Sequence, residues 1–111
     1  MSSEFVHLHN HTDYSLLDAA QSVEMLCDRV EELKMDTIAI TEHGNLFSMI
    51  PFYKHAIKKG IKPIIGCELY IAMESHKKKE RIPGKGLGYH HLVLLVQNEL
   101  GYRNLMKLVS I

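Results

Sequence analysis

The chain has 111 residues and a formal net charge of zero with histidine counted as neutral, so it is one small domain or part of a larger one. Its hydrophobic content of 46% and charged content of 23% are ordinary for a globular protein with a modest core. The balanced charge argues against a general attraction to nucleic acid or membrane, and no apolar run is long enough to span a bilayer. Two cysteines without CxxC spacing argue against a disulfide scaffold and predict a reducing, cytoplasmic compartment.

The first predicted element is an extended strand that starts near Phe5 and carries His7, His9 and His11 at alternate positions. Alternate side chains share one face of a strand, with neighbours about 6–7 Å apart. Imidazole nitrogens arranged in this way suit convergence on one metal ion, or on two neighbouring ions. Asp18 follows after a turn-like D-Y-S segment and can close over the same site. The simpler alternative is a solvated histidine-rich strand, whereas a tag remnant is disfavoured because the histidines are interleaved with other residues.

The next four predicted elements alternate helix with strand. Apolar residues at helical spacing predict amphipathic helices, and short β-branched apolar runs predict buried parallel strands. Ser22 is the expected N-cap of the first helix, and Gly60 is the expected end of the second. The predicted elements are a helix over 23–34, a strand over 37–41, a helix over 48–59 and a strand over 62–71.

The last third of the chain is predicted to hold an exposed basic loop, a strand and a helix. The loop is rich in lysine and glycine, and phosphate binding is the alternative to a merely solvated excursion. His90 and His91 open the strand, and the final helix has no terminating signal, so we expect the chain to end inside a longer domain. The predicted elements are the loop over 74–89, the strand over 92–96 and a helix that begins after Asn98 and reaches Val109.

The order of these elements indicates an α/β protein with a largely parallel sheet. In such folds, functional groups collect at the carboxyl ends of the strands. His9 and His11 end the first strand, whereas His43 and Glu68 lie where the second and third strands finish. Four metal-capable side chains from three strands are therefore expected to converge, which favours a metal site over separate core histidines.

Several motifs carry a resemblance to a known family: L-H-N-H-T, the nearby Asp18, T-E-H-G-N and G-C-E-L-Y. Together they resemble the PHP (polymerase and histidinol phosphatase) domain. Longer blocks, from G-N-L-F-S to L-Y-I-A and from H-L-V-L-L to K-L-V-S, are similar to the amino-terminal PHP domain of bacterial DNA polymerase III alpha subunits. The resemblance implies a distorted seven-stranded, TIM-like β/α barrel, of which residues 1–111 would form about the first half.

The resemblance also implies a ligand set for up to three divalent metals, which would be Zn, Mn or Fe. Glu68 would bridge two metals, and His7 would orient the ligands or form the floor of the site. His91 heads its strand, so it reaches the site only if the chain returns antiparallel after Ile71, and His90 is its competitor. The implied metal ligands are His9, His11, Asp18, His43, Glu68 and His91.

Two positions depart from the family pattern without removing a ligand. The chain has Ala19 where a glycine usually follows the first-turn aspartate, and Glu42 where an aspartate commonly precedes the second-strand histidine. The family supplies its remaining ligands from later strands, beyond residue 111. We therefore expect weak metal binding and little activity from this chain alone.

In the intact family protein the polymerase extends a primer, and a complete PHP site is similar to a metal-dependent 3′→5′ proofreading exonuclease. The resemblance thus implies DNA and replisome subunits as partners of the full-length protein, without a membrane. Two alternatives are a free-standing PHP phosphomonoesterase, such as a histidinol-phosphate phosphatase, and a non-catalytic scaffold for the proofreading subunit. Because half a barrel leaves sheet edges and apolar surface open, we also expect the chain to self-associate.

Overall fold

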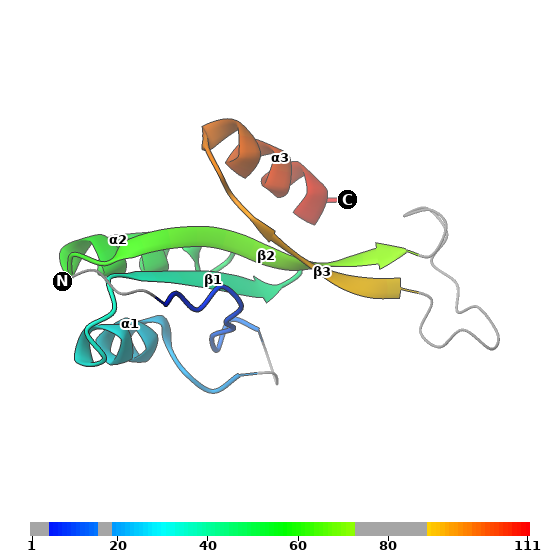
Figure 1. Ribbon diagram of the computed structural model, residues 1–111. Helices are drawn as coiled ribbons and strands as arrows, with labels where there is room; N and C mark the ends of the chain where they lie inside the picture. Colours follow the sequence, from blue (N-terminus) through cyan, green and yellow to red (C-terminus); the bar gives the residue numbers. More distant parts are fainter. Residues whose placement is uncertain (1–4, 16–18, 73–88) are drawn as a thin grey trace.

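A mixed α/β arrangement is seen in the computed structural model, which describes residues 5–15, 19–72 and 89–111. A three-stranded sheet forms the centre, and helices α1 and α2 lie apart from α3 (Figure 1). The elements in chain order are α1 (Val23–Glu32), β1 (Thr37–His43), α2 (Met49–Lys58), β2 (Lys62–Ala72), β3 (Tyr89–Leu95) and α3 (Glu99–Val109).

The strand order is β1-β2-β3, with one parallel and one antiparallel pair. The strands β1 and β2 run parallel and are joined through α2, and their register pairs His43 with Glu68. The chain then returns antiparallel, so that Tyr70 pairs with His91. This return confirms the condition under which His91 was expected to approach the site.

The predicted strand over the amino-terminal histidines is wrong, because residues 5–12 form no regular strand. The segment lies beside β1 and accepts two backbone hydrogen bonds, from Ala39 N–H to the His7 carbonyl (3.1 Å) and from Thr41 N–H to the Asn10 carbonyl (2.8 Å). The two hydrogen bonds are three residues apart on the segment but two residues apart on β1. This mismatch interrupts the regular ladder of backbone hydrogen bonds that two paired strands would form. The Asn10 side chain takes part in this break, since its Nδ2 donates to the carbonyls of Ala39 (2.9 Å) and His7 (3.1 Å).

The main core lies between α1, α2 and one face of β1. Phe52 and Ala56 of α2 and Ile38 and Ile40 of β1 are almost completely buried there. Burial of such side chains stabilises the fold by about 1.5–3 kcal/mol for each large one. The remaining buried members of this cluster are Val23, Leu26, Cys27, Val30, Met49 and Ile61.

Local signals set the helix ends. Ser22 Oγ accepts a hydrogen bond from Met25 N–H (3.1 Å), and Asn98 Oδ1 accepts one from Gly101 N–H (2.9 Å), which confirms both predicted N-caps. The first helix ends at Glu32, two residues earlier than predicted, because Lys34 adopts a left-handed conformation with φ of 59°. In the part of the chain that the structure describes, no helix has the length and apolar character needed to cross a membrane.

Candidate metal centre

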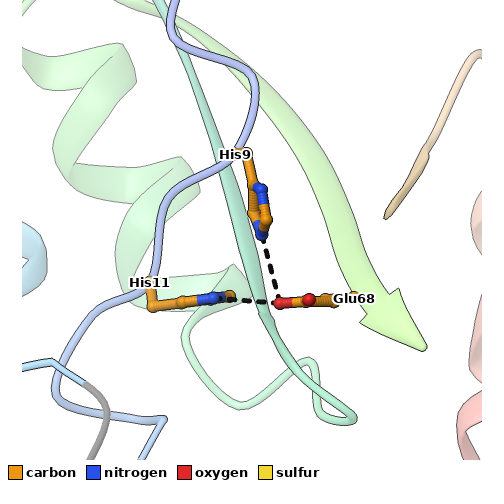
Figure 2. Close-up of side chains that lie close together, drawn as sticks. All are labelled: His9, His11 and Glu68. Carbon is orange, nitrogen blue, oxygen red and sulfur yellow. Dashed lines mark hydrogen bonds and ion pairs between the residues drawn. The ribbon is translucent and has the colours of Figure 1, made fainter. Parts of the chain in front are cut away.

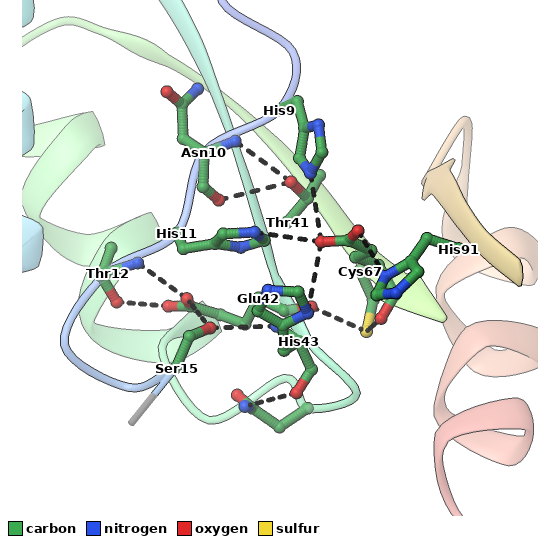
Figure 3. A network of polar contacts seen from close by, with 12 residues as sticks. His9, Asn10, His11, Thr12, Ser15, Thr41, Glu42, His43, Cys67 and His91 are labelled. Carbon is green, nitrogen blue, oxygen red and sulfur yellow. Dashed lines mark hydrogen bonds and ion pairs between the residues drawn. The ribbon is translucent and has the colours of Figure 1, made fainter. Parts of the chain in front are cut away.

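The carboxylate of Glu68 is the point on which the histidines converge (Figures 2 and 3). Its Oε2 lies 3.1 Å from His9 Nε2, 3.0 Å from His11 Nε2 and 3.3 Å from His43 Nδ1. Its Oε1 lies 2.8 Å from His91 Nδ1. Four imidazole rings from three separate parts of the chain therefore surround one carboxylate.

The sheet register explains how these residues meet. His43 ends β1 directly beside Glu68, in the middle of β2. His91 is opposite Tyr70, which lies two residues after Glu68 and so shares its face of the sheet. His90 is opposite Ile71 and lies on the other face. The structure thus brings His91, and not His90, to Glu68.

His9 and His11 reach Glu68 from the irregular segment, although the predicted strand does not form there. Figure 2 shows the two rings approaching the carboxylate from different directions. Their centroids are 5.2 Å apart with an edge-to-face geometry, whereas His11 and His43 stack with centroids 4.0 Å apart. These ring contacts fix the orientation of the imidazoles relative to one another.

The site is open on one side and closed on the other. The Glu68 side chain is only 6% exposed, whereas those of His9 and His91 are 54% and 47% exposed. Burial alone would raise the pKa of Glu68, but its hydrogen bond to His9 and the proximity of His43 and His91 lower the pKa below the usual value for a glutamate. The carboxylate is therefore an anion at neutral pH. The partly exposed rings of His9 and His91 lie between it and the solvent.

The donor set fits a divalent metal. Two groups of donor atoms share Glu68, and within each group the ligand atoms lie within 4.8 Å of one another. The contacts to the carboxylate span 2.8–3.3 Å, which is close to the separation of about 3.3 Å between two ligands of a tetrahedral zinc ion. Nitrogen and carboxylate oxygen atoms are also suitable donors for Zn, Mn and Fe. The two groups are His9, His11 and Glu68, and His43, Glu68 and His91.

Three features expected from the sequence are not among the described members of this cluster. Asp18 and almost all of the basic loop lie outside the described residues. His7 is exposed and packs edge-on against Phe5, with ring centroids 4.7 Å apart, and its carbonyl joins the segment to β1.

Sequence reasoning missed a buried hydrogen-bond network beside the histidines (Figure 3). Glu42 Oε1 accepts hydrogen bonds from Thr12 N–H (2.8 Å) and from the Ser15 hydroxyl (2.7 Å), and its Oε2 accepts one from the Thr12 hydroxyl. The only available signal was that Glu42 is a carboxylate next to a candidate ligand. Its partners lie about 30 residues away in the chain, and no periodic pattern indicates such a contact.

The fold and site define a class of protein: an α/β domain in which histidines gather around a carboxylate at the end of a parallel strand pair. The chain belongs to the PHP domain family, whose model matches residues 7–111. This confirms the resemblance seen in the motifs.

Relatives in sequence include DNA polymerase III alpha subunits. The chain is 51% identical to that of Borreliella burgdorferi over 98% of its length, and 49% and 48% identical to those of Treponema pallidum and Thermus aquaticus over 96%. It covers 9% of each of these relatives, so it spans about a tenth of their length.

Two solved structures share the fold. An amidohydrolase from Chromobacterium violaceum, with bound sulfate and no metal, has a TM-score of 0.63 at 20% identity over 92% of this chain and 32% of its own. A protein from Bifidobacterium adolescentis, to which metal-dependent phosphoesterase activity has been ascribed, has a TM-score of 0.64 at 16% identity over 95% of this chain and 33% of its own.

Proposed function

We propose that this chain is an amino-terminal part of the PHP domain of a DNA polymerase III alpha subunit, and that its site is a metal-dependent phosphoesterase. The single observation that carries the site proposal is the convergence of four imidazole nitrogens within 3.3 Å of the buried Glu68 carboxylate. The relatives at 44–51% identity support the polymerase assignment over a free-standing phosphomonoesterase. In the whole protein, the partners would be DNA and the other replisome subunits, in the cytoplasm.

The metals would be divalent Zn, Mn or Fe, held in two positions that share Glu68. A divalent cation there would activate a water molecule and stabilise negative charge on a phosphate. Glu68 supplies anionic oxygens from the closed side of the site, and the histidines supply nitrogens from the open side. The residues that would hold the cations are His9, His11, His43, Glu68 and His91, with Asp18 as a further ligand.

The proposed reaction in the whole protein is the 3′→5′ removal of misincorporated nucleotides. Among the described histidines of the site, His9 and His91 are the most exposed, so a phosphodiester would enter past these two rings. The sheet behind Glu68 would shield the reacting groups from water on the closed side, which strengthens electrostatic contacts within the site.

We also propose that the three strands form the first part of a seven-stranded barrel, which later residues would complete. The parallel β1–α2–β2 unit, with the site at the end of β1, is the arrangement that supports it. Residues 1–111 would then be about the first half of the domain, and the chain alone would have little activity.

The test is the removal of a mispaired 3′ nucleotide by the full-length polymerase subunit in the presence of Mn²⁺. The proposal predicts that His43→Ala loses this activity and that His90→Ala, a matched change on the opposite face of the sheet, keeps it. Primer extension by the wild type and by both variants serves as the control, because it requires an intact, folded protein. Equal nuclease activity in wild type and His43→Ala would contradict the proposal, and no nuclease activity in the wild type would favour a scaffold for the proofreading subunit.

A further inference from the structure

Glu42 is a completely buried carboxylate that joins two separate segments of the chain. It lies in β1 next to His43, and it accepts its hydrogen bonds from Thr12 and Ser15 of the amino-terminal segment. Ser15 Oγ in turn accepts a hydrogen bond from the backbone N–H of His43 (2.9 Å). Figure 3 shows this network directly beneath the histidine cluster.

Burial of a carboxylate is unfavourable unless its oxygens receive hydrogen bonds or a positive charge. Among the residues that the structure describes, no lysine, arginine or histidine forms an ion pair with Glu42. Among the described residues, three donors compensate for the burial of this carboxylate, and each of them belongs to the segment that follows His11. Apolar residues would fill the same space without this desolvation penalty, so a role in positioning is a physical reason to have a carboxylate here.

The network acts on two of the candidate ligands at once. Thr12 directly follows His11, so both of its hydrogen bonds to Glu42 fix the backbone that carries the His11 ring. The contact from Ser15 fixes the backbone of His43. The rings of His11 and His43 stack with centroids 4.0 Å apart, and both contact the same oxygen of Glu68.

We infer that Glu42 is a positioning residue, which sets the distance between His11 and His43 and thereby makes the site competent to bind metal. The inference rests on the proposed function only in its last step, since the geometry of the two rings is independent of any metal. A purely structural Glu42 would affect stability and leave the ring geometry of the folded protein unchanged.

The experiment compares Glu42→Gln and Glu42→Asp with the wild-type chain. Gln keeps the size of the side chain but replaces one acceptor oxygen with a donor, whereas Asp keeps both acceptors on a shorter stem. The control for a general loss of stability is Val30→Ala, which leaves a cavity in the core beside α1 and changes no residue of the Glu42 hydrogen-bond network. Two readouts are measured: Zn²⁺ affinity by calorimetric titration, and the proximity of the His11 and His43 rings by nuclear Overhauser contacts in the metal-free protein.

We expect Glu42→Gln to weaken Zn²⁺ binding about 10–100-fold and to lose the ring contact, as for other groups that orient metal ligands. Glu42→Asp should retain more affinity than Glu42→Gln, and Val30→Ala should keep both the affinity and the contact. If Glu42→Gln does not fold, Ser15→Ala, which removes the link to His43, is expected to show the same losses.

Unchanged ring contact and affinity in Glu42→Gln, or in Ser15→Ala where the first does not fold, would overturn the inference. So would an equal loss of affinity in Val30→Ala. If wild type binds no Zn²⁺, the proposed metal function fails, and the ring contact alone still decides the positioning role of Glu42.

Discussion

At the scale of single residues, the side of the sheet on which a side chain lies decides whether it can reach Glu68. His90 and His91 are adjacent in β3, yet only His91 lies within hydrogen-bond distance of this carboxylate, at 2.8 Å. A shift of the register by one residue would exchange the two. Sequence alone left them as competitors because the antiparallel pairing depends on where the chain returns after the basic loop.

The two histidines therefore give a matched pair of variants. His91→Ala should weaken divalent-metal binding by at least the roughly 10–100-fold that loss of a supporting contact produces. His90→Ala should bind as wild type. Metal content of the full-length subunit after dialysis measures both, and a loss confined to His90→Ala would mean that the register of β3 is wrong by one residue.

A second residue-scale prediction concerns Cys27, which is fully buried in the α1 core. Burial, together with the nearby Asp28 carboxylate, raises the pKa of its thiol from 9.0 to about 11. The thiol should therefore resist alkylation at pH 8 in the folded chain and react only after unfolding. Rapid modification under native conditions would contradict this burial.

The same shift predicts the direction of a pH dependence. The unfolded thiol ionises near pH 9 and the folded thiol near pH 11, so the folded state holds its proton more tightly. The resulting stabilisation is complete below pH 9 and is lost as the pH rises toward 11. Urea unfolding between pH 8 and 11 measures it, and Cys27→Ala should show a smaller decline than wild type.

At the scale of elements, a close approach of β3 to β2 requires a glycine at position 66. A Cβ atom there would lie 2.6 Å from the Leu94 carbonyl oxygen and 2.9 Å from side-chain atoms of Leu95 and Thr41. A backbone carbonyl cannot move aside without shifting β3, which carries His91. The Gly in the G-C-E motif is thus needed to bring β3 close enough to Glu68.

Gly66→Ala should therefore lower the free energy of unfolding by about 1–3 kcal/mol, as overpacking of a close contact does. Gly101→Ala is the control, because its Cβ would meet no atom closer than 3.6 Å and alanine favours the helix. Denaturant unfolding compares the two. Equal stabilities for Gly66→Ala and wild type would show that β3 does not pack so closely.

The number and order of the helices and strands after residue 22 were predictable because each carries its own local signal. The predicted strand over 92–96 was displaced, however, since β3 spans Tyr89–Leu95 and includes both His90 and His91. The caps at Ser22 and Asn98 and the buried run in β1 needed no distant information. The histidine segment was mispredicted as a strand because Asn10 bonds the backbone of β1 through its side chain and breaks the ladder. Most members of the site were still predictable from the HxH motif and from His43 at the end of β1, which pairs with Glu68 inside β2.

At the scale of the whole molecule, apolar surface and an open sheet edge remain exposed. Among the described residues, β3 has no strand partner on its outer edge, whereas the outer edge of β1 is met by the backbone of His7 and Asn10. Phe47, Ile50 and Leu100 are 73%, 61% and 66% exposed. Such edges and patches favour association with another chain.

We therefore predict that the 111-residue chain self-associates, with a two-fold dimer as the expected form. Sedimentation velocity over a range of concentrations measures it. A monomer at all concentrations, with a sharp unfolding transition, would contradict the prediction.

That Glu68 is the centre of a metal site is tested most directly by calorimetric titration of the chain with Zn²⁺ and Mn²⁺. We predict saturable but weak binding by wild type, and its loss in Glu68→Gln, which removes the anionic oxygens shared by four histidines. Glu32→Gln, a change on the exposed face of α1, should bind as wild type. Binding that is unchanged in Glu68→Gln, or absent from the wild-type chain, would contradict a metal centre at Glu68.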